Sequence, residues 1–259
     1  MRLNTQHSAK TYLERVENLE TLKPCEETNQ VLSGLVNDII EENISEKELE
    51  VEEIHRLRKI CGEAEFELEK QWAEKIIESE NPRQKIRDFP YYENYVKLAE
   101  FEYSTLVGCC NDIKKNAVFV GGGPLPMTAL IFAKHYGFDI TVMDRSQEAV
   151  EKSRKLLEAL NINGKVIESS AEEFTDFREY DIIHVASMVG TNKEEELEVF
   201  KKIKSQLDKH THIIGRTVHG NRRLLYRPVS NKVKEMFKVE AERRPSTDIV
   251  NSTTVMSIN

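Results

Sequence analysis

The sequence predicts an α/β protein in which a bundle of helices precedes a mostly parallel, doubly wound sheet. Before about residue 114, glutamate, lysine and leucine dominate and glycine is scarce, which is typical of helices. After residue 115, short β-branched segments alternate with helical ones, and this alternation indicates a parallel sheet with helices on both faces. We therefore expect a helical domain at residues 1–114 and a Rossmann-like domain at residues 115–259.

The first part of the chain contains helix patterns and clear helix breakers. Apolar residues recur at helical spacing between Leu32 and Ile40. Breakers stand at Asn81-Pro82 and at Phe89-Pro90, so a helix from about His55 to Glu80 should end there. A second helix should begin before Tyr95. Several packed helices are the natural interpretation.

The second part begins after the polar stretch Asn111 to Asn116, which is the best candidate for a domain boundary. The helical stretch Met127 to Tyr136 follows the first expected strand. Ligands of such sheets bind at the carboxyl ends of the strands. The expected strands are Val118 to Val120, Ile140 to Val142, Lys165 to Ile167, Ile182 to Val185, Ile213 to Ile214 and Thr253 to Ser257.

A glycine-rich loop after the first strand is the most informative feature of the chain. Residues 118–126 read Val-Phe-Val-Gly-Gly-Gly-Pro-Leu-Pro, and glycines let backbone approach a ligand closely. Asp144 ends the next strand, where such folds place a carboxylate on ribose hydroxyls. The alternative is a tight turn beside a solvated Asp144. The expected ligand-binding residues are Gly121, Gly122, Gly123, Pro124, Leu125, Pro126 and Asp144.

The two prolines of this loop argue against a dinucleotide. Pro124 and Pro126 remove two backbone donors where a pyrophosphate would need them. An adenosyl ligand without phosphate fits better, and S-adenosylmethionine is such a ligand. We therefore expect S-adenosylmethionine as the bound small molecule.

Two later loops should complete the pocket. Ser169 to Glu172 follows the third strand and should lie near the adenine, with Ser170 and Ala171 as contacts. Ser187, after the fourth strand, should border the sulfonium and the acceptor pocket. Ser169 and Ser170 suit a helix cap equally well. Met188 is expected to serve packing.

Composition narrows the class of protein. Charged residues make up 32% of the chain and the formal net charge is −8, which disfavours a nucleic-acid partner. No apolar run approaches the roughly 20 residues of a membrane span, and the N-terminus lacks the apolar core of a signal peptide. These features predict a cytoplasmic protein without a membrane partner.

Cysteines and histidines show no metal-binding pattern. The four cysteines lack a repeated metal spacing, and we expect reduced thiols. Adjacent Cys109 and Cys110 suit a packed helix end better than a redox pair. His210, His212 and His219 have no partner at zinc spacing, so no metal is expected.

Several strings together resemble a known family, the archaeal and bacterial nicotianamine synthase-like enzymes. The resemblance covers roughly residues 65–259 and rests on AVFVGGGPLPMTALIFAKHYG, VMD, IIGRT, LLYRPVS and VNSTTV. It implies a class I S-adenosylmethionine-dependent methyltransferase-like Rossmann fold. It also implies transfer of the 3-amino-3-carboxypropyl group of S-adenosylmethionine to an amino-acid amine, with release of methylthioadenosine. Products of that family include opine-type metallophore precursors.

The chemistry needs an amine that has lost its proton, because an ammonium has no lone pair. A carboxylate partly removed from water can accept that proton, and a tyrosine hydroxyl can orient the amine. The resemblance implies that Glu69 and Tyr95 are this pair. From the residues alone, Glu69 is one of many helical glutamates and Tyr95 a core aromatic. Arg216, at a strand end, suits capture of a substrate carboxylate or a salt bridge.

Four hypotheses follow for the function. The leading one is aminocarboxypropyl transfer to an amino acid. A second uses the same pocket for cyclisation of S-adenosylmethionine to azetidine-2-carboxylate, as in some proteins that resemble this family. A methyltransferase is the third, and a non-catalytic S-adenosylmethionine sensor, against which Glu69 and Tyr95 speak, is the fourth. The acceptor, the number of transfers, the role of residues 1–60 and the oligomeric state, with a homodimer among the options, stay open.

Overall fold

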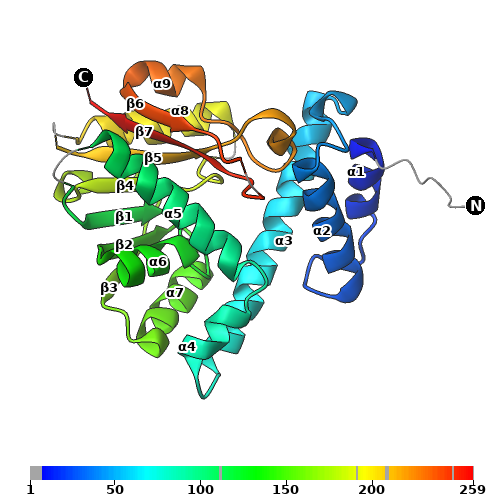
Figure 1. Ribbon diagram of the computed structural model, residues 1–259, viewed down its shortest axis with the longest axis horizontal. Helices are drawn as coiled ribbons and strands as arrows, with labels where there is room; N and C mark the ends of the chain where they lie inside the picture. Colours follow the sequence, from blue (N-terminus) through cyan, green and yellow to red (C-terminus); the bar gives the residue numbers. More distant parts are fainter. Residues whose placement is uncertain (1–7, 111–112, 191, 208–209, 247, 259) are drawn as a thin grey trace, which may run out of the picture.

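The computed structural model describes residues 8–110, 113–190, 192–207, 210–246 and 248–258. A group of helices stands beside a layered α/β unit, and the long helix α3 runs between them (Figure 1). The expected α/β class with a mostly parallel sheet is confirmed. The polar stretch predicted as a boundary includes residues 111–112, which lie outside the described residues.

The first part of the chain folds into helices at the predicted places. The predicted helix His55 to Glu80 is α3, which begins at Val51 and ends at Ile77. Asn81 then caps the next short helix, because its Oδ1 accepts a hydrogen bond of 3.2 Å from the backbone of Gln84. The helices are α1 Ala9–Glu17, α2 Glu26–Ile40, α3 Val51–Ile77, α4 Pro82–Lys85 and α5 Tyr92–Cys109, with 3-10 turns η1 Glu46–Glu48 and η2 Ile86–Asp88.

The second part forms a sheet of seven strands in the order β3-β2-β1-β4-β5-β7-β6. Strands β1 to β5 are parallel, and β7 is antiparallel to both of its neighbours. All six predicted strand segments are present. The strands are β1 Asn116–Val120, β2 Asp139–Asp144, β3 Gly164–Glu168, β4 Ile182–Val185, β5 His212–Thr217, β6 Lys238–Arg243 and β7 Ser252–Ser257.

The sequence analysis missed β6, and its composition explains why. The strand reads Lys-Val-Glu-Ala-Glu-Arg, lies at the edge of the sheet, and has an irregularity between Val239 and Ala241. Charges and bulges at an edge prevent pairing with other chains. They also remove the apolar alternation by which a strand is recognised.

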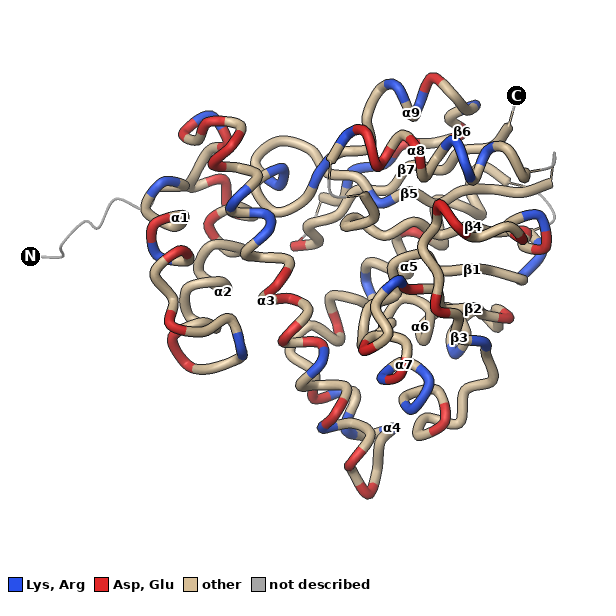
Figure 2. Tube along the Cα trace, turned by 180° about the vertical axis from the view of Figure 1, so that it is seen from behind, with Lys and Arg blue, Asp and Glu red and all other residues tan. Residues whose placement is uncertain are grey.

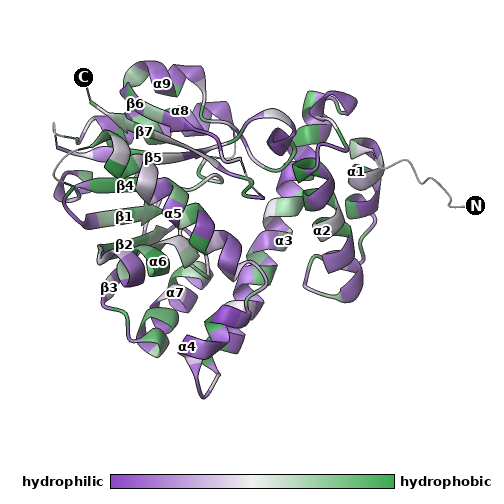
Figure 3. Cartoon of the chain, viewed as in Figure 1, coloured by the Kyte–Doolittle hydropathy of each residue, from purple (hydrophilic) through white to green (hydrophobic). Residues whose placement is uncertain are grey.

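Alternate residues of the central strand face two different cores. Ala117 and Phe119 of β1 pack with helices α5, α6 and α7, whereas Val118 and Val120 pack with α8 and α9. Figure 3 shows hydrophobic strands between helices with polar outer faces. The remaining elements are α6 Met127–Tyr136, α7 Gln147–Leu160, η3 Phe177–Glu179, α8 Lys193–Lys204, η4 Gly220–Leu224 and α9 Asn231–Met236.

Helix α3 joins the two parts of the molecule. Its 27 residues span about 40 Å at the usual rise. Leu57, near its start, is buried with α1, α2 and the segment Leu224-Leu225, whereas Ala73 and Ile76 near its end belong to a core of the sheet. The middle of α3 therefore faces the space between the helical group and the sheet.

Charged residues are distributed in a similar way over the two parts of the chain (Figure 2). Acidic and basic residues are interspersed along the helices of both (Figure 2). Within the described residues, none of the helices is long and apolar enough to traverse a bilayer.

At the end of α5, the Sγ atoms of Cys109 and Cys110 lie 3.6 Å apart as free thiols, and Cys110 is buried.

Candidate active site

A cavity of about 1340 Å³ lies between α2, the middle of α3 and the carboxyl ends of the strands. Nearly all residues predicted from the sequence line it. Pro124, which is buried, is not among the lining residues. The predicted residues that line the cavity are Glu69, Tyr95, Gly121, Gly122, Gly123, Leu125, Pro126, Asp144, Ser170, Ala171, Ser187 and Arg216.

The glycine loop is fixed by hydrogen bonds to the neighbouring strand. Gly121 and Gly122 donate through their backbone N–H groups to the carbonyl oxygen of Met143 at 2.9 and 3.1 Å. Ser153 donates to the carbonyl oxygen of Gly123 at 2.8 Å. These glycine N–H groups are thus already paired. The glycines serve the site by bringing bare backbone close to it.

Asp144 ends β2 and is held on both of its oxygens. Its Oδ2 accepts from the backbone N–H of Gly123 and its Oδ1 from that of Ser146, each at 2.9 Å. Each carboxylate oxygen has a further lone pair that can accept from a hydroxyl donor. Asp144 is therefore half-buried and pre-positioned rather than freely solvated.

Glu69 and Tyr95 meet at the edge of this loop. The Tyr95 hydroxyl donates to Glu69 Oε1 at 3.2 Å. The other oxygen of Glu69 lies against Gly123, where a Cβ atom would come within 2.7 Å of it. Burial and then the negative charge of Glu65 raise the pKa of Glu69 well above its usual range. Helix α3 thus delivers a poorly solvated carboxyl group to the loop.

A second pair of the same kind was not predicted from the sequence. The Tyr226 hydroxyl donates to Glu65 Oε2 at 2.9 Å, and both residues line the cavity. Burial raises the pKa of Glu65. The spacing of Glu65 and Glu69 places both on one face of α3 and was readable in the sequence. Their tyrosine partners come from distant segments, and no local pattern shows them.

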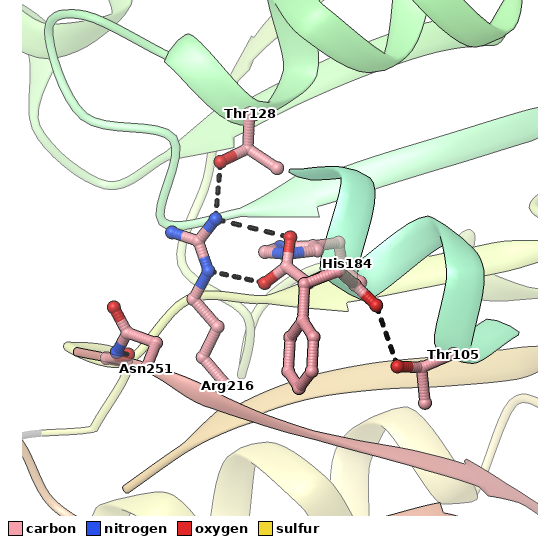
Figure 4. A network of polar contacts seen from close by, with 8 residues as sticks. Thr105, Thr128, His184, Arg216 and Asn251 are labelled. Atoms are coloured by element: carbon pink, nitrogen blue, oxygen red, sulfur yellow. Dashed lines mark hydrogen bonds and ion pairs between the residues drawn. The ribbon is translucent and has the colours of Figure 1, made fainter. Parts of the chain in front are cut away.

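Arg216 lies at the end of β5 as expected, but its partner is internal. Its Nε and Nη2 atoms lie 2.7 and 3.3 Å from the two oxygens of Glu102, and Nη2 also donates to Thr128 (Figure 4). The structure therefore shows the salt bridge that was the alternative for Arg216, and capture of a substrate carboxylate by this residue stays a prediction. The carboxylate of Glu102 on α5 is fully buried and needs a cationic partner, and the guanidinium of Arg216 supplies it.

His184 completes this buried network from β4. Its Nε2 atom lies 3.1 Å from Glu102 Oε2. Burial alone would raise the pKa of Glu102, but the charges of Arg216 and His184 outweigh it and lower the pKa to about 2. The guanidinium of Arg216 lies 6.0 Å from the ring centre of Tyr95. The network thus holds a cation beneath the Glu69–Tyr95 pair and neutralises it with Glu102.

The loops after β3 and β4 complete the wall. Ser170 Oγ accepts from the backbone of Glu173 at 3.3 Å, which caps a turn rather than the helix considered above. Asn251, which the sequence analysis did not identify, donates to Ser187 Oγ at 2.7 Å. Met188 is half-exposed and packs across the cavity against Gly62 of α3. No cluster of three or more metal-ligating side chains occurs in the described residues.

A comparison with known families decides the relationship. The profile of the family described as "Nicotianamine synthase protein" matches residues 7–258. This chain belongs to the nicotianamine synthase family. Nicotianamine synthase 3 of Arabidopsis thaliana is 30% identical to it over 258 residues, which are 93% of this chain and 80% of the plant protein. The resemblance described from the sequence is thereby confirmed.

Solved structures agree with this assignment. MtNAS in complex with MTA and tNA has a TM-score of 0.81 to this chain at 25% identity, over 96% of each chain. A variant of MtNAS in complex with S-adenosylmethionine gives 0.80. Mitomycin 7-O-methyltransferase MmcR, at 12% identity and a TM-score of 0.52 over 73% of this chain and 60% of that one, shows the shared fold alone.

Proposed function

We infer that this member of the nicotianamine synthase family is an S-adenosylmethionine-dependent aminocarboxypropyltransferase. It transfers the 3-amino-3-carboxypropyl group to the amine of an amino acid and releases methylthioadenosine. The observation that carries this proposal is the Glu69–Tyr95 pair, hydrogen-bonded at 3.2 Å and pressed against Gly123 of the glycine loop. The solved MtNAS complexes with S-adenosylmethionine and with MTA support it.

The residues present fit S-adenosylmethionine. A Cβ atom at Gly123 would meet the Glu69 carboxylate, so only a residue without a side chain fits between the loop and this acid. Asp144 is fixed at the end of β2 with acceptor capacity for two ribose hydroxyls. Glu65, Glu69 and Asp144 supply negative charge, and the nearby Arg216 is already paired with Glu102. This surplus favours a positively charged sulfonium ligand.

The donor contributes a γ-carbon that its sulfonium sulfur activates for attack. Glu69 accepts the proton of the attacking amine, because its raised pKa makes it a better base than an ordinary carboxylate. Tyr95 holds the Glu69 carboxylate and orients the amine. Arg216, fixed by Glu102 and Thr128, lies 6.0 Å from the ring centre of Tyr95.

The two parts of the chain divide this work in our proposal. Residues 1–114 supply Glu69 and Tyr95, and residues 115–259 supply the loop, Asp144, Ser170, Ala171 and Ser187 for the donor. The cavity of about 1340 Å³ has room for an amino-acid acceptor beside the donor. We further propose that the product is a metallophore-type compound, since several amine and carboxylate groups joined in one chain suit metal binding.

One incubation tests the reaction. The purified protein is given S-adenosylmethionine with and without a mixture of amino acids, and the products are identified by mass spectrometry. We expect methylthioadenosine together with an adduct of one amino acid. S-adenosylhomocysteine as the main product would contradict the proposal and indicate methyl transfer. Methylthioadenosine and azetidine-2-carboxylate in equal yield without any amino acid would indicate cyclisation instead.

A further inference from the structure

The cavity contains a carboxylate–tyrosine pair that the proposed reaction does not use. Glu65 and Tyr226 repeat the arrangement of Glu69 and Tyr95 one turn earlier on α3, with hydrogen bonds of 2.9 and 3.2 Å respectively. Both carboxylates line the same cavity. A catalytic base needs only one such pair, so the second requires its own explanation.

Glu65 lacks a cationic partner within the described residues. Among the described residues, no lysine or arginine forms an ion pair with Glu65 or Glu69, and the fork of Arg216 is held by Glu102. A poorly solvated carboxylate whose hydrogen-bond partners are the tyrosine hydroxyls of Tyr226 and Tyr95 is costly to keep charged. A cationic group of a ligand would supply the missing charge. Tyr226 would fix the orientation of the carboxylate toward that group.

The spacing of the two pairs matches that of two amines in the reaction. Side chains four residues apart on a helix have Cβ atoms about 5–6 Å apart. In the donor tail, three bonds of about 1.5 Å separate the α-amine from the γ-carbon. The attacking amine approaches that carbon to about 3–3.5 Å from the other side. Two amines a few ångströms apart thus face two carboxylates one helical turn apart.

We propose that Glu65 and Tyr226 bind the α-ammonium group of the donor tail and keep it protonated, while Glu69 and Tyr95 serve the attacking amine. This inference rests on the proposed function. A protonated amine has no lone pair and cannot attack the γ-carbon of its own molecule. The Glu65–Tyr226 pair therefore directs the enzyme toward transfer to a second molecule.

Loss of the pair opens a competing route. The free α-amine forms a carbon–nitrogen bond to the γ-carbon while the carbon–sulfur bond breaks and its electron pair goes to sulfur. The sulfonium becomes neutral methylthioadenosine, and the amine proton passes to Glu69 or to water. The carbon product is the four-membered ring of azetidine-2-carboxylate.

Binding tests the pair without turnover. Calorimetry compares S-adenosylmethionine with its analogue that lacks the α-amino group, and methylthioadenosine reports the folded nucleoside site. Because hydrogen bonds to charged groups are strong, the wild-type protein should prefer S-adenosylmethionine by roughly tenfold to a hundredfold. Glu65→Gln should lose most of this preference and keep its affinity for methylthioadenosine. Tyr226→Phe should lose a smaller part.

Two control variants make the result specific. Glu67→Gln changes a glutamate on the same helix that pairs with Lys70 at 3.2 Å outside the cavity lining, and it should keep the preference. Glu69→Gln should also keep it, because that residue serves the other amine. An unchanged preference in Glu65→Gln, with normal methylthioadenosine affinity, would overturn the proposal.

Product analysis separates this inference from the proposed function. With S-adenosylmethionine and an accepted amino acid, Glu65→Gln should raise the ratio of azetidine-2-carboxylate to transfer product at least severalfold. An unaltered ratio in a variant that still transfers refutes the role of Glu65 and leaves the proposed function standing. A wild-type protein that discriminates for the α-amine but never forms methylthioadenosine refutes the proposed function and leaves the ammonium site standing.

Discussion

The polar groups on the two walls of the cavity differ in their hydrogen-bond and ion-pair partners. On the sheet side, the N–H groups of Gly121 and Gly122 pair with Met143, and both oxygens of Asp144 accept backbone hydrogen bonds. On the helix side, Glu65 and Glu69 have tyrosine partners and no ion pair among the described residues. The polar groups of the sheet wall are thus already hydrogen-bonded within the protein, whereas the helix wall holds carboxyl groups whose pKa values burial has raised.

This contrast separates binding from chemistry. A rigid, satisfied support can position a ligand at little cost, because few of its groups must reorganise. A carboxyl group with a raised pKa is less stable in its charged form and is a stronger base for that reason. Perturbed groups in a cleft are typical of functional sites. Substitution of the catalytic base Glu69 on the helix wall should therefore affect rate, and substitutions on the sheet wall should affect affinity.

The largest expected effect comes from Glu69→Gln on the helix wall. The variant keeps the shape of the side chain but cannot accept a proton, and loss of a general base costs about a hundredfold to ten-thousandfold in rate. Binding of S-adenosylmethionine should change little. Rates at saturating substrate, together with calorimetry, measure both quantities.

Tyr95→Phe should have a smaller effect on rate than Glu69→Gln. It removes one hydroxyl that positions the carboxylate at 3.2 Å, so its rate should fall less than that of Glu69→Gln. Near-normal turnover by Glu69→Gln would mean that the contrast between the two walls has no catalytic meaning.

Glu102→Gln, beneath the helix wall, should mainly reduce stability. It leaves the buried guanidinium of Arg216 without its counter-charge, and breaking a buried ion pair costs about 3–5 kcal/mol. Urea denaturation measures the loss. Glu198→Gln, which breaks an exposed pair with Lys201, is the control and should cost about 0–1 kcal/mol. Equal losses in both variants would show that the network is not a structural support.

The pH dependence of stability sharpens this prediction. The pKa of Glu102 is about 2 in the folded protein and is lower than in the unfolded chain. Its contribution is therefore complete above the pKa of an unfolded glutamate, about 4.3, and is lost as the pH falls toward 2. In Glu102→Gln, this part of the acid-induced loss of stability should disappear.

Asp144→Ala, on the sheet wall, should reduce affinity more than rate. It removes the acceptor of the ribose hydroxyls, and charge-assisted hydrogen bonds of this kind contribute on the order of 1.5–3 kcal/mol. Calorimetry with S-adenosylmethionine and methylthioadenosine should show a similar loss for both. Asp139→Ala, at the opposite end of β2, is exposed and should leave both affinities unchanged. Unchanged affinity in Asp144→Ala would refute its assignment.

How far the sequence predicted these walls follows from how local each feature is. The sheet wall was predictable, because the glycine loop and Asp144 lie on consecutive elements with fixed roles in such folds. On the helix wall, Glu69 and Tyr95 were identified by family resemblance alone. Glu65 with Tyr226, and Glu102 with Arg216, are separated by 161 and 114 positions, and composition cannot show such contacts. Strand β6 was missed because its charges hide the alternation of a strand.

Gly123 lies where the two walls meet, and Gly123→Ala should have the smallest effect of these substitutions. Gly123 has φ +68°, a left-handed conformation that costs a residue with a Cβ atom roughly 1–2 kcal/mol. The new methyl group would also come within 2.7 Å of Glu69 Oε2 and displace that carboxylate from the loop. We expect a modest loss of stability together with a lower rate. Gly108→Ala, in helix α5 with nothing within 4 Å of the added atom, should instead be neutral or stabilising. A Gly123→Ala enzyme with reduced stability but full activity would show that Glu69 acts without contact to the loop, and that the two walls work independently.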